Sequence, residues 1–229
     1  MFGHDFYHGT IRRYVIMFGN IFNEIQIKRF DQAGTKIQTV NVPITYGPKS
    51  KMIERVIADP TLNRATSTVL PRMGFSLDSM GYNPARKLNT AAQFLKKSGS
   101  AQDQFSSMYA PVPYDFQFSL SILTKNSEDG IQIVEQIVPF FTPDYTVTMK
   151  VLPEMDLKLD IPIELGSVSS DDSYEGAVED KRVLSWDLNF VVKGYLFGPI
   201  TRGKYITQAD INFFDDNFPQ TIVGTEHIE

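Results

Sequence analysis

The chain has 229 residues, an apolar content of 42%, a charged content of 21% and a formal net charge of −5. These values are typical of a globular protein with a substantial core, in one sizeable domain or two small ones. The chain contains no cysteine, which excludes disulfides and thiolate metal sites, so we expect folding in a cytoplasm. No run of about 18 apolar residues occurs and residues 1–22 do not resemble a signal peptide, so no membrane association is expected.

The charges are distributed unevenly along the chain. Residues 1–99 hold 14 Lys and Arg against 6 Asp and Glu, a net charge of +8. Residues 100–229 hold 8 against 21, a net charge of −13. This division predicts an oriented surface. It fits two solvated faces of opposite sign, or a molecule that meets copies of itself or stacked partners through opposite potentials.

The N-terminal part predicts a helix followed by a hairpin. Apolar residues at helical spacing run from Ile11 to Phe22, with Thr10 as a plausible N-cap. Alternating apolar residues on both sides of a turn at residues 31–34 then predict two strands. Pro43 lies in the second arm and cannot donate to a strand ladder, so we expect an edge strand or the end of the strand there.

Residues 52–77 predict a short helix and then an irregular strand. The helix covers residues 52–57 and ends at Asp59-Pro60. The strand-like pattern of residues 66–77 is interrupted by Pro71 and Gly74, which predicts a bend or bulge.

The clearest unit is the segment Tyr114 to Val151, which reads as strand, helix and strand. Residues 114–122 alternate between apolar and polar side chains, as do residues 145–151. Between them, apolar residues recur at intervals of three and four residues, which predicts a helix. Ser127 is its candidate N-cap, and Pro139 limits its end. The segment is a packing unit and contains no residues arranged for catalysis.

Two further strands are predicted over residues 157–165 and 184–197. The second is apolar on one face throughout, and Tyr195 and Phe197 add apolar side chains to the region where it ends. A strand that is apolar on both faces is usually covered, so we expect a helix or a neighbouring subunit there.

The predicted fold class is α+β: a twisted, mainly antiparallel sheet with a few helices packed on one face. We expect a single core domain over residues 1–199 and a C-terminal extension over residues 200–229. Irregular segments at about 83–113 and 167–181 are predicted to be long protruding loops. Phe213 and Phe214 are the candidate anchors through which the extension docks.

The sequence contains no arrangement typical of an enzyme. Phosphate-binding glycine motifs and a Gly-x-Ser-x-Gly elbow are absent. His4, Asp5 and His8 have a spacing that could bring two imidazoles to a metal, but a solvated terminus is the simpler interpretation. The acidic residues Asp171, Asp172 and Glu175 crowd a polar segment, where a solvated loop is favoured over a carboxylate site of an unrecognised enzyme. No catalytic residue, metal site or cofactor is predicted.

Basic and aromatic residues gather around the first irregular segment. Arg86, Lys87, Lys96 and Lys97 lie near several aromatic residues, a combination that single-stranded nucleic acid can use. A charged loop with core-seeking aromatic residues explains it equally well, and the acidic sequence pI of about 5.3 argues against tight duplex binding.

An ordered set of short blocks resembles the tail sheath stabiliser and completion proteins of T-even-type contractile phages, over most of residues 1–200. The densest block lies in the helix of the strand-helix-strand unit. The blocks are Met1 to Gly3, Ile11 to Tyr14, Asn23 to Arg29 (NEIQIKR), Val42 to Tyr46 (VPITY), Thr68 to Arg72 (TVLPR), Gly81 to Asn83, Gln132 to Phe140 (QIVEQIVPF), Thr148 and Met149, Leu184 to Trp186, and Val192 to Leu196.

The resemblance implies a non-enzymatic ring with a tail-terminator-like fold. It implies a homo-hexamer at the head-proximal end of the virion tail, which contacts the sheath protein, the tail terminator protein and the neck proteins. DNA would pass through the lumen without specific binding. We further hypothesise that part of the acidic surface lines this lumen, where repulsion would prevent DNA from sticking. A tail terminator or neck adaptor ring is the alternative within the same class.

The candidate subunit or partner interface therefore draws on the irregular segments, the end of the last long strand and the C-terminal extension. Its residues are Arg86, Lys87, Lys96, Lys97, Asp171, Asp172, Glu175, Tyr195, Phe197, Phe213 and Phe214.

Overall fold

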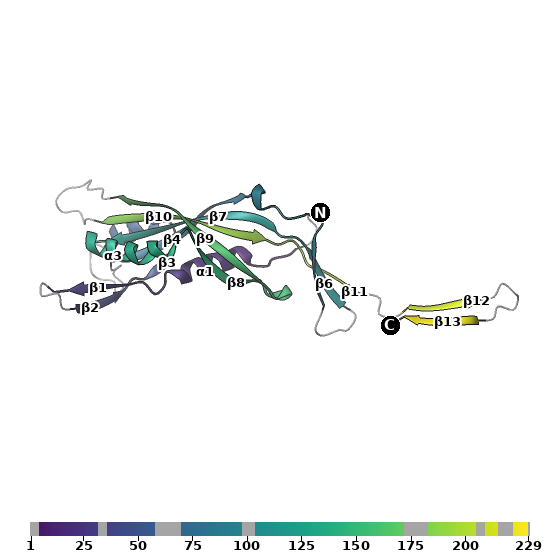
Figure 1. The fold of residues 1–229 in the computed structure, drawn as a ribbon. Helices are drawn as coiled ribbons and strands as arrows, with labels where there is room; N and C mark the ends of the chain where they lie inside the picture. Colours follow the sequence, from purple (N-terminus) through teal and green to yellow (C-terminus); the bar gives the residue numbers. More distant parts are fainter. Residues whose placement is uncertain are drawn as a thin grey trace. The chain divides into compact units, whose positions relative to one another are not determined.

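The computed structural model divides the chain into two compact units, whose elements are shown in Figure 1. The large unit comprises Tyr7–Lys87 and Val112–Leu196, and the small unit comprises Met1–Phe6, Leu88–Pro111 and Phe197–Glu229. The structure describes residues 5–31, 36–57, 70–97, 104–171, 183–204, 209–214 and 222–228.

The large unit is built on a curled six-stranded sheet with the strand order β3-β4-β7-β10-β9-β8. Only the pair β3 and β4 is parallel, and the other neighbours are antiparallel, in agreement with the mainly antiparallel sheet that was predicted. The strands are β3 (Ile44–Tyr46), β4 (Arg72–Tyr82), β7 (Val112–Thr124), β8 (Asp144–Leu152), β9 (Leu157–Asp171) and β10 (Leu184–Leu196).

The alternation along the central strands gives this sheet one apolar and one polar face. Phe118 pairs with Phe190 of β10, and both side chains are buried. The neighbouring pair of Ser119 and Asn189 belongs to the other face, because successive side chains of a strand point to opposite sides. The mixed α+β class expected from the sequence is therefore confirmed.

Two helices cover the apolar face. Phe18 of α1 (Thr10–Ile21) stacks on Phe118 with ring centroids 4.5 Å apart. Gly130 of α3 (Ser127–Ile137) lies so close to Trp186 that an added Cβ would meet its Nε1 at 2.6 Å. Close approach of this helix to β10 therefore requires glycine at that position.

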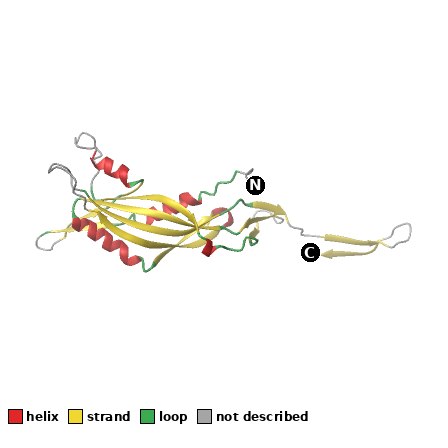
Figure 2. Ribbon diagram, turned by 90° about the horizontal axis from the view of Figure 1, so that it is seen from above, coloured by secondary structure: helices red, strands yellow, loops and turns green. Residues whose placement is uncertain are grey.

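The third helix, α2 (Lys49–Ile57), lies on the polar face instead. Its Lys49 ammonium donates to Asp187 of β10 at 2.6 Å, and Met52 packs over Gly74 of β4. Figure 2 shows helices on both sides of the strands. The sequence predicted helices on one face. The polar face also holds a helix, because the Asp187 carboxylate on this face pairs with Lys49 of α2.

Both long helices begin at the residue that was predicted to cap them. Thr10 and Ser127 are the first helical residues, and the preceding positions are Gly9, with a φ of 64°, and Asn126. Asp129 lies in the first turn of α3 and pairs with Arg29 at 3.3 Å. A carboxylate at this end of a helix is stabilised by the helix dipole.

The predicted N-terminal hairpin forms its own two-stranded sheet, β1 (Gln26–Phe30) with β2 (Lys36–Asn41). It lies along α3, where the Gln136 side chain donates to the carbonyl of Gln26 at 2.9 Å. The second arm ends before Pro43, whose carbonyl accepts from the Met73 amide at 2.9 Å as the chain enters the six-stranded sheet. This confirms the expectation that the strand ends there.

The small unit corrects the prediction of long irregular loops. Residues 83–113 include two strands of a three-stranded sheet with the order β11-β6-β5, and residues 200–229 add the antiparallel pair β12 and β13. In the second segment, β9 continues to Asp171, and residues 172–182 lie outside the described part of the chain. The strands are β5 (Gln93–Lys97), β6 (Gln104–Tyr109), β11 (Thr201–Lys204), β12 (Ala209–Phe214) and β13 (Ile222–Ile228), and the 3-10 turns are η1 (Pro84–Arg86), η2 (Val138–Phe140) and η3 (Pro153–Met155).

Candidate functional site

The open edge of the large sheet is the clearest candidate interface. β8 is the last strand in the sheet order, and none of the described strands pairs with its outer edge. Such an edge presents unpaired backbone groups that can add another strand. One of its carbonyls is already bound, because Arg13 of α1 donates to Val151 at 2.5 Å. The remaining edge from Asp144 to Met149 is six residues long.

A hollow is lined by residues of this strand and of α1. We call it the α1–β8 groove, and its volume is about 450 Å³. Ile16 on α1 is 51% exposed and Tyr145 on β8 is 38% exposed, although both are large apolar side chains. The residues that line the groove are Arg13, Ile16, Met17, Asn20, Ile21, Tyr145, Val147 and Met149.

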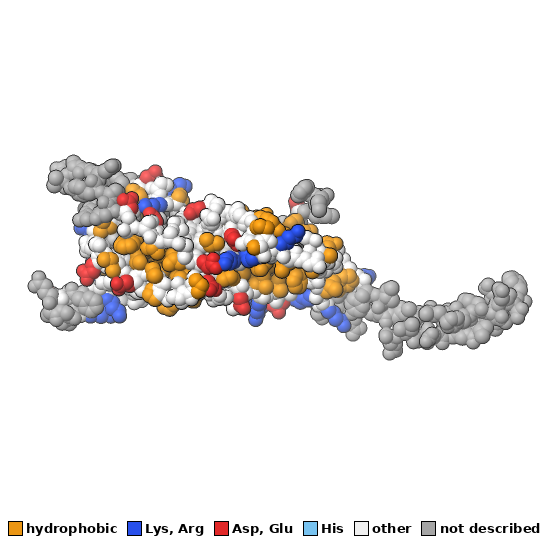
Figure 3. Space-filling model, turned by 45° about the horizontal axis from the view of Figure 1, so that its top comes forward, with side chains coloured by type: hydrophobic (Ala, Val, Ile, Leu, Met, Phe, Trp, Pro, Cys, Tyr) orange, Lys and Arg blue, Asp and Glu red, His pale blue; other side chains and the backbone are white. Residues whose placement is uncertain are grey.

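The groove continues into a second apolar hollow of about 550 Å³ at the end of α3. Ile21 and Tyr145 line both, and Phe140 stands at the second with 66% of its surface exposed. Figure 3 shows one face of the molecule, on which hydrophobic side chains form surface patches interrupted by charged groups. Apolar surface beside an unpaired strand edge is typical of a protein–protein contact.

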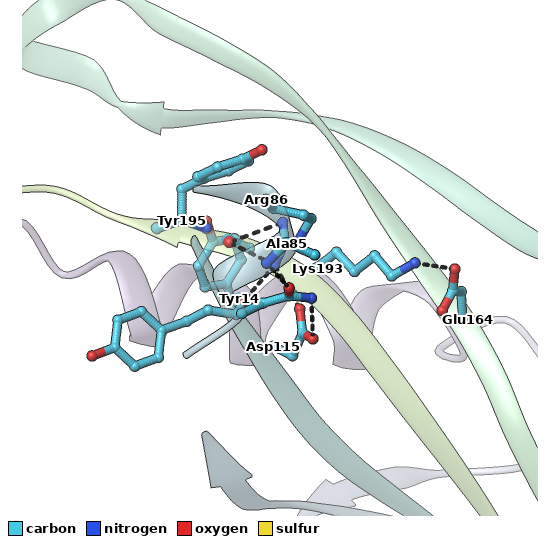
Figure 4. A network of polar contacts seen from close by, with 10 residues as sticks. Tyr14, Ala85, Arg86, Asp115, Glu164, Lys193 and Tyr195 are labelled. Carbon is cyan, nitrogen blue, oxygen red and sulfur yellow. Dashed lines mark hydrogen bonds and ion pairs between the residues drawn. The ribbon is translucent and has the colours of Figure 1, made fainter. Parts of the chain in front are cut away.

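A polar network fixes the N-terminal half of α1 to the sheet (Figure 4). The Tyr14 hydroxyl donates to the carbonyl of Tyr195 at 3.0 Å and accepts from its amide at 2.9 Å. Tyr195 lies beyond Val192, where the pairing of β10 with β9 ends. The hydroxyl thus supplies the partners that a neighbouring strand no longer provides. Burial raises the pKa of Tyr14 from 10.0 to about 12, although the hydrogen bond with the Tyr195 backbone and the charge of Arg86 act to lower it.

Arg86 connects the same region to β7. Its Nη2 donates to Asp115 at 2.5 Å and to the carbonyl of Tyr114 at 3.0 Å. Its guanidinium carbon lies 5.2 Å from the centroid of the Tyr195 ring, a cation–π distance. Asn83 donates to the second oxygen of Asp115 at 2.8 Å, so both oxygens of this carboxylate are bound. The arrangement orders the end of β4 and has no free acid or base.

The polar face carries a second group of ion pairs. Lys193 pairs with Glu164, as Figure 4 also shows, and Asp187 is bound by both Lys49 and Ser121. Lys49 also lies 3.0 Å from the hydroxyl of Ser185, a distance found in Ser–Lys catalytic pairs. An ammonium engaged in an ion pair is not a base, so these contacts join α2 to the sheet.

The structure brings together only some of the residues that the sequence nominated. Arg86 and Tyr195 contact each other inside the large unit, and Lys87 follows η1 with an exposed side chain. Asp171 ends β9 and is exposed. In the small unit, Lys96 and Lys97 line a hollow beside β5, Phe197 is buried, and Phe213 and Phe214 lie on β12. Asp172 and Glu175 lie outside the described residues.

Sequence reasoning did not find the α1–β8 groove. Val147 and Met149 follow the alternation of a buried strand, and nothing local distinguishes an edge strand from a central one. The one available signal was Ile16, an isoleucine outside the apolar stripe of the first helix. Its exposure places an apolar group where an amphipathic helix normally carries a polar one.

The described residues contain no group of three or more His, Asp or Glu that could hold a metal ion. His4 of the weighed metal site lies outside them. Within the same ranges, no helix has the length and apolar character needed to cross a membrane.

Comparison with known proteins gives two matches. The family described as the T4-like virus Myoviridae tail sheath stabiliser matches residues 5–227. The tail completion protein gp15 of Enterobacteria phage T4 is 33% identical over 224 residues, covering 95% of this chain and 80% of that protein. The family match includes β12 and extends into β13, beyond the region near residue 200 where the sequence resemblance ended.

Proposed function

Because the chain belongs to the tail sheath stabiliser family of T4-like Myoviridae, a family of structural tail proteins, we propose that it forms a ring at the head-proximal end of the contractile tail. It is a structural protein of the virion tail. The proposed ring is a homo-hexamer that holds the sheath and the tube terminator and offers the neck an attachment surface. The observation that carries this proposal is the extent of the match, which includes the described elements of both units.

The surface of the large unit supports an assembly role. A closed ring needs two different, complementary surfaces on each subunit. The α1–β8 groove is one unpartnered apolar surface with an open strand edge. The uneven charge, +8 over residues 1–99 and −13 over residues 100–229, offers complementary potentials for orienting copies.

The proposed lumen is lined in part by the acidic surface. DNA passing through the neck carries closely spaced negative charges, and acidic walls repel it. A structure of the ring tests this part directly. A lumen lined mainly by Lys and Arg would overturn it without affecting the proposed contact with the sheath.

The function is tested with tails assembled without this chain. Added purified protein is expected to form six-subunit rings at the head-proximal end, visible by electron microscopy, and to slow the loss of sheath subunits on dilution. Protein unfolded by heat before addition is the matched control. Unchanged sheath loss with properly folded protein would overturn the proposal.

The same experiment separates the alternative of a tail terminator or neck adaptor. Binding to isolated tubes without sheath favours a terminator, and binding only to neck components favours an adaptor. Binding that requires polymerised sheath favours the sheath stabiliser. Assembly of the virion in the host cytoplasm is part of the proposal.

A further inference from the structure

We propose that the α1–β8 groove receives the C-terminal hairpin, β12 with β13, of a neighbouring copy of this chain. This inference rests on the proposed ring and specifies the contact that closes it. The hairpin would add to the free edge of β8, while its apolar residues would cover the groove beside α1.

The receiving surface is prepared for a strand. The free part of the β8 edge, Asp144 to Met149, is six residues long, and β12 also has six residues. Beyond it, the Arg13 bond to the Val151 carbonyl closes the edge, so an added strand would end there. Ile16 and Tyr145 supply exposed apolar surface in the groove beside this part of the edge.

The hairpin forms a two-stranded sheet of its own within the described part of the chain. Among the described strands, β12 and β13 pair only with each other. A two-stranded hairpin is marginally stable in water without a third strand or a packing surface. Its strands contain Ile211, Phe213 and Phe214, and Ile222, Val223 and Ile228, an apolar content that a solvated tail does not need.

Charge complementarity favours this acidic hairpin as the occupant of the groove. Residues 205–229 contain five Asp and Glu and no Lys or Arg. Of the described residues, those that line the groove include Arg13 and no acidic residue, and α1 carries Arg12 and Arg13 without any acid. Glu24 and Glu135 line the second hollow at the end of α3 and do not line the groove. The acidic hairpin is therefore expected over the groove and not over that second hollow.

Cross-linking between engineered cysteines tests the contact, because the natural chain has none. One full-length chain carries Thr146→Cys on β8, and a second, distinguished by a mass tag, carries Asn212→Cys on β12. A short bifunctional thiol reagent should join the two chains when they are mixed at a ring-forming concentration. The control pairs Asn212→Cys with Thr39→Cys, an exposed position on β2, and should give no product.

A substitution in the groove provides the second measurement. Ile16→Glu should raise the concentration needed for ring assembly about tenfold or more, because it removes apolar contact and repels the acidic hairpin. Ile16→Lys should raise it less. Ile131→Glu on α3 is the matched control, since Ile131 is 44% exposed and does not line the groove.

The outcomes separate this inference from the proposed function. Rings that form without a cross-link between the Thr146→Cys and Asn212→Cys chains would overturn this inference and leave the proposed ring intact. The same holds if a chain that carries both substitutions forms the cross-link only within itself. Normal assembly of Ile16→Glu with lost sheath binding would also overturn it, by assigning the groove to the sheath. A cross-linked pair that neither closes into rings nor protects sheath would support the contact and contradict the proposed function.

Discussion

The phenol of Tyr14 binds both backbone groups of Tyr195, donating to the carbonyl at 3.0 Å and accepting from the amide at 2.9 Å. The two residues are 181 positions apart, so one hydroxyl joins the first helix to the end of the last long strand. The Tyr14 side chain is fully buried, and its ring lies 4.9 Å from that of Phe116. This contact orders the helix that also lines the α1–β8 groove.

Replacing Tyr14 by Phe should destabilise the protein. The substitution keeps the ring and leaves the Tyr195 amide and carbonyl without their partner, which costs about 1–3 kcal/mol for a buried group. Urea unfolding followed by circular dichroism measures the change. Tyr46→Phe is the control, because Tyr46 is 59% exposed, and an equal loss in both variants would contradict the assignment.

Alkaline pH should lower the free energy of unfolding of the wild type more than that of the Tyr14→Phe variant. Burial raises the pKa of Tyr14 in the folded protein to about 12, against 10.0 for the ordinary side chain. Above pH 10 the unfolded chain loses this proton more readily than the folded one, so the free energy of unfolding falls as the pH rises. The loss approaches about 3 kcal/mol above pH 12. Unfolding curves of both proteins between pH 9 and about 12 test it, and parallel pH profiles would contradict it.

The Arg86–Asp115 pair should contribute more to stability than an exposed pair. Their side chains are 20% and 27% exposed, and Asp115 is also held by Asn83. A double-mutant cycle with Arg86→Met and Asp115→Asn should give a coupling of about 1–3 kcal/mol. The same cycle with Lys150→Met and Asp156→Asn should give less than about 1 kcal/mol, since that pair is 57% and 59% exposed. Equal couplings would contradict the argument.

Gly194→Ala should destabilise the large unit through the same helix contact. A Cβ at this position would lie 2.7 Å from Cε2 of Phe116 and 2.8 Å from Cζ of Tyr14, so two buried rings would have to move. Overpacking of this kind costs about 1–3 kcal/mol. Gly81→Ala on β4 is the control, because a Cβ there meets nothing within 4 Å. Thermal unfolding of both variants measures the difference.

Local sequence patterns predicted most of the secondary structure of the large unit. The alternation from Tyr114 to Ile122 and the stripe of α3 follow from which side chains must be buried, and burial repeats with the period of the element. The place where the second hairpin arm ends followed from Pro43, which has no amide hydrogen. Where the predictions were wrong, as in the loops at residues 83–113, short strands with turn residues between them resembled irregular chain.

The interface was not predictable in the same way. Arg86 was nominated as one of the basic residues around the irregular segment, and Tyr195 as an apolar residue where the last long strand ends. The structure shows that the Arg86 guanidinium lies over the Tyr195 ring. The groove depends on β8 being the outermost strand, a consequence of the order β3-β4-β7-β10-β9-β8.

The sequence by itself determined the α+β class, the strand faces and the resemblance to a tail protein family, because these depend on residue type and spacing. The tertiary structure alone decided which edge stays unpaired and which polar groups become partners across 181 residues. Strand order and long-range contacts arise from the packing of the whole chain, and no local period encodes them.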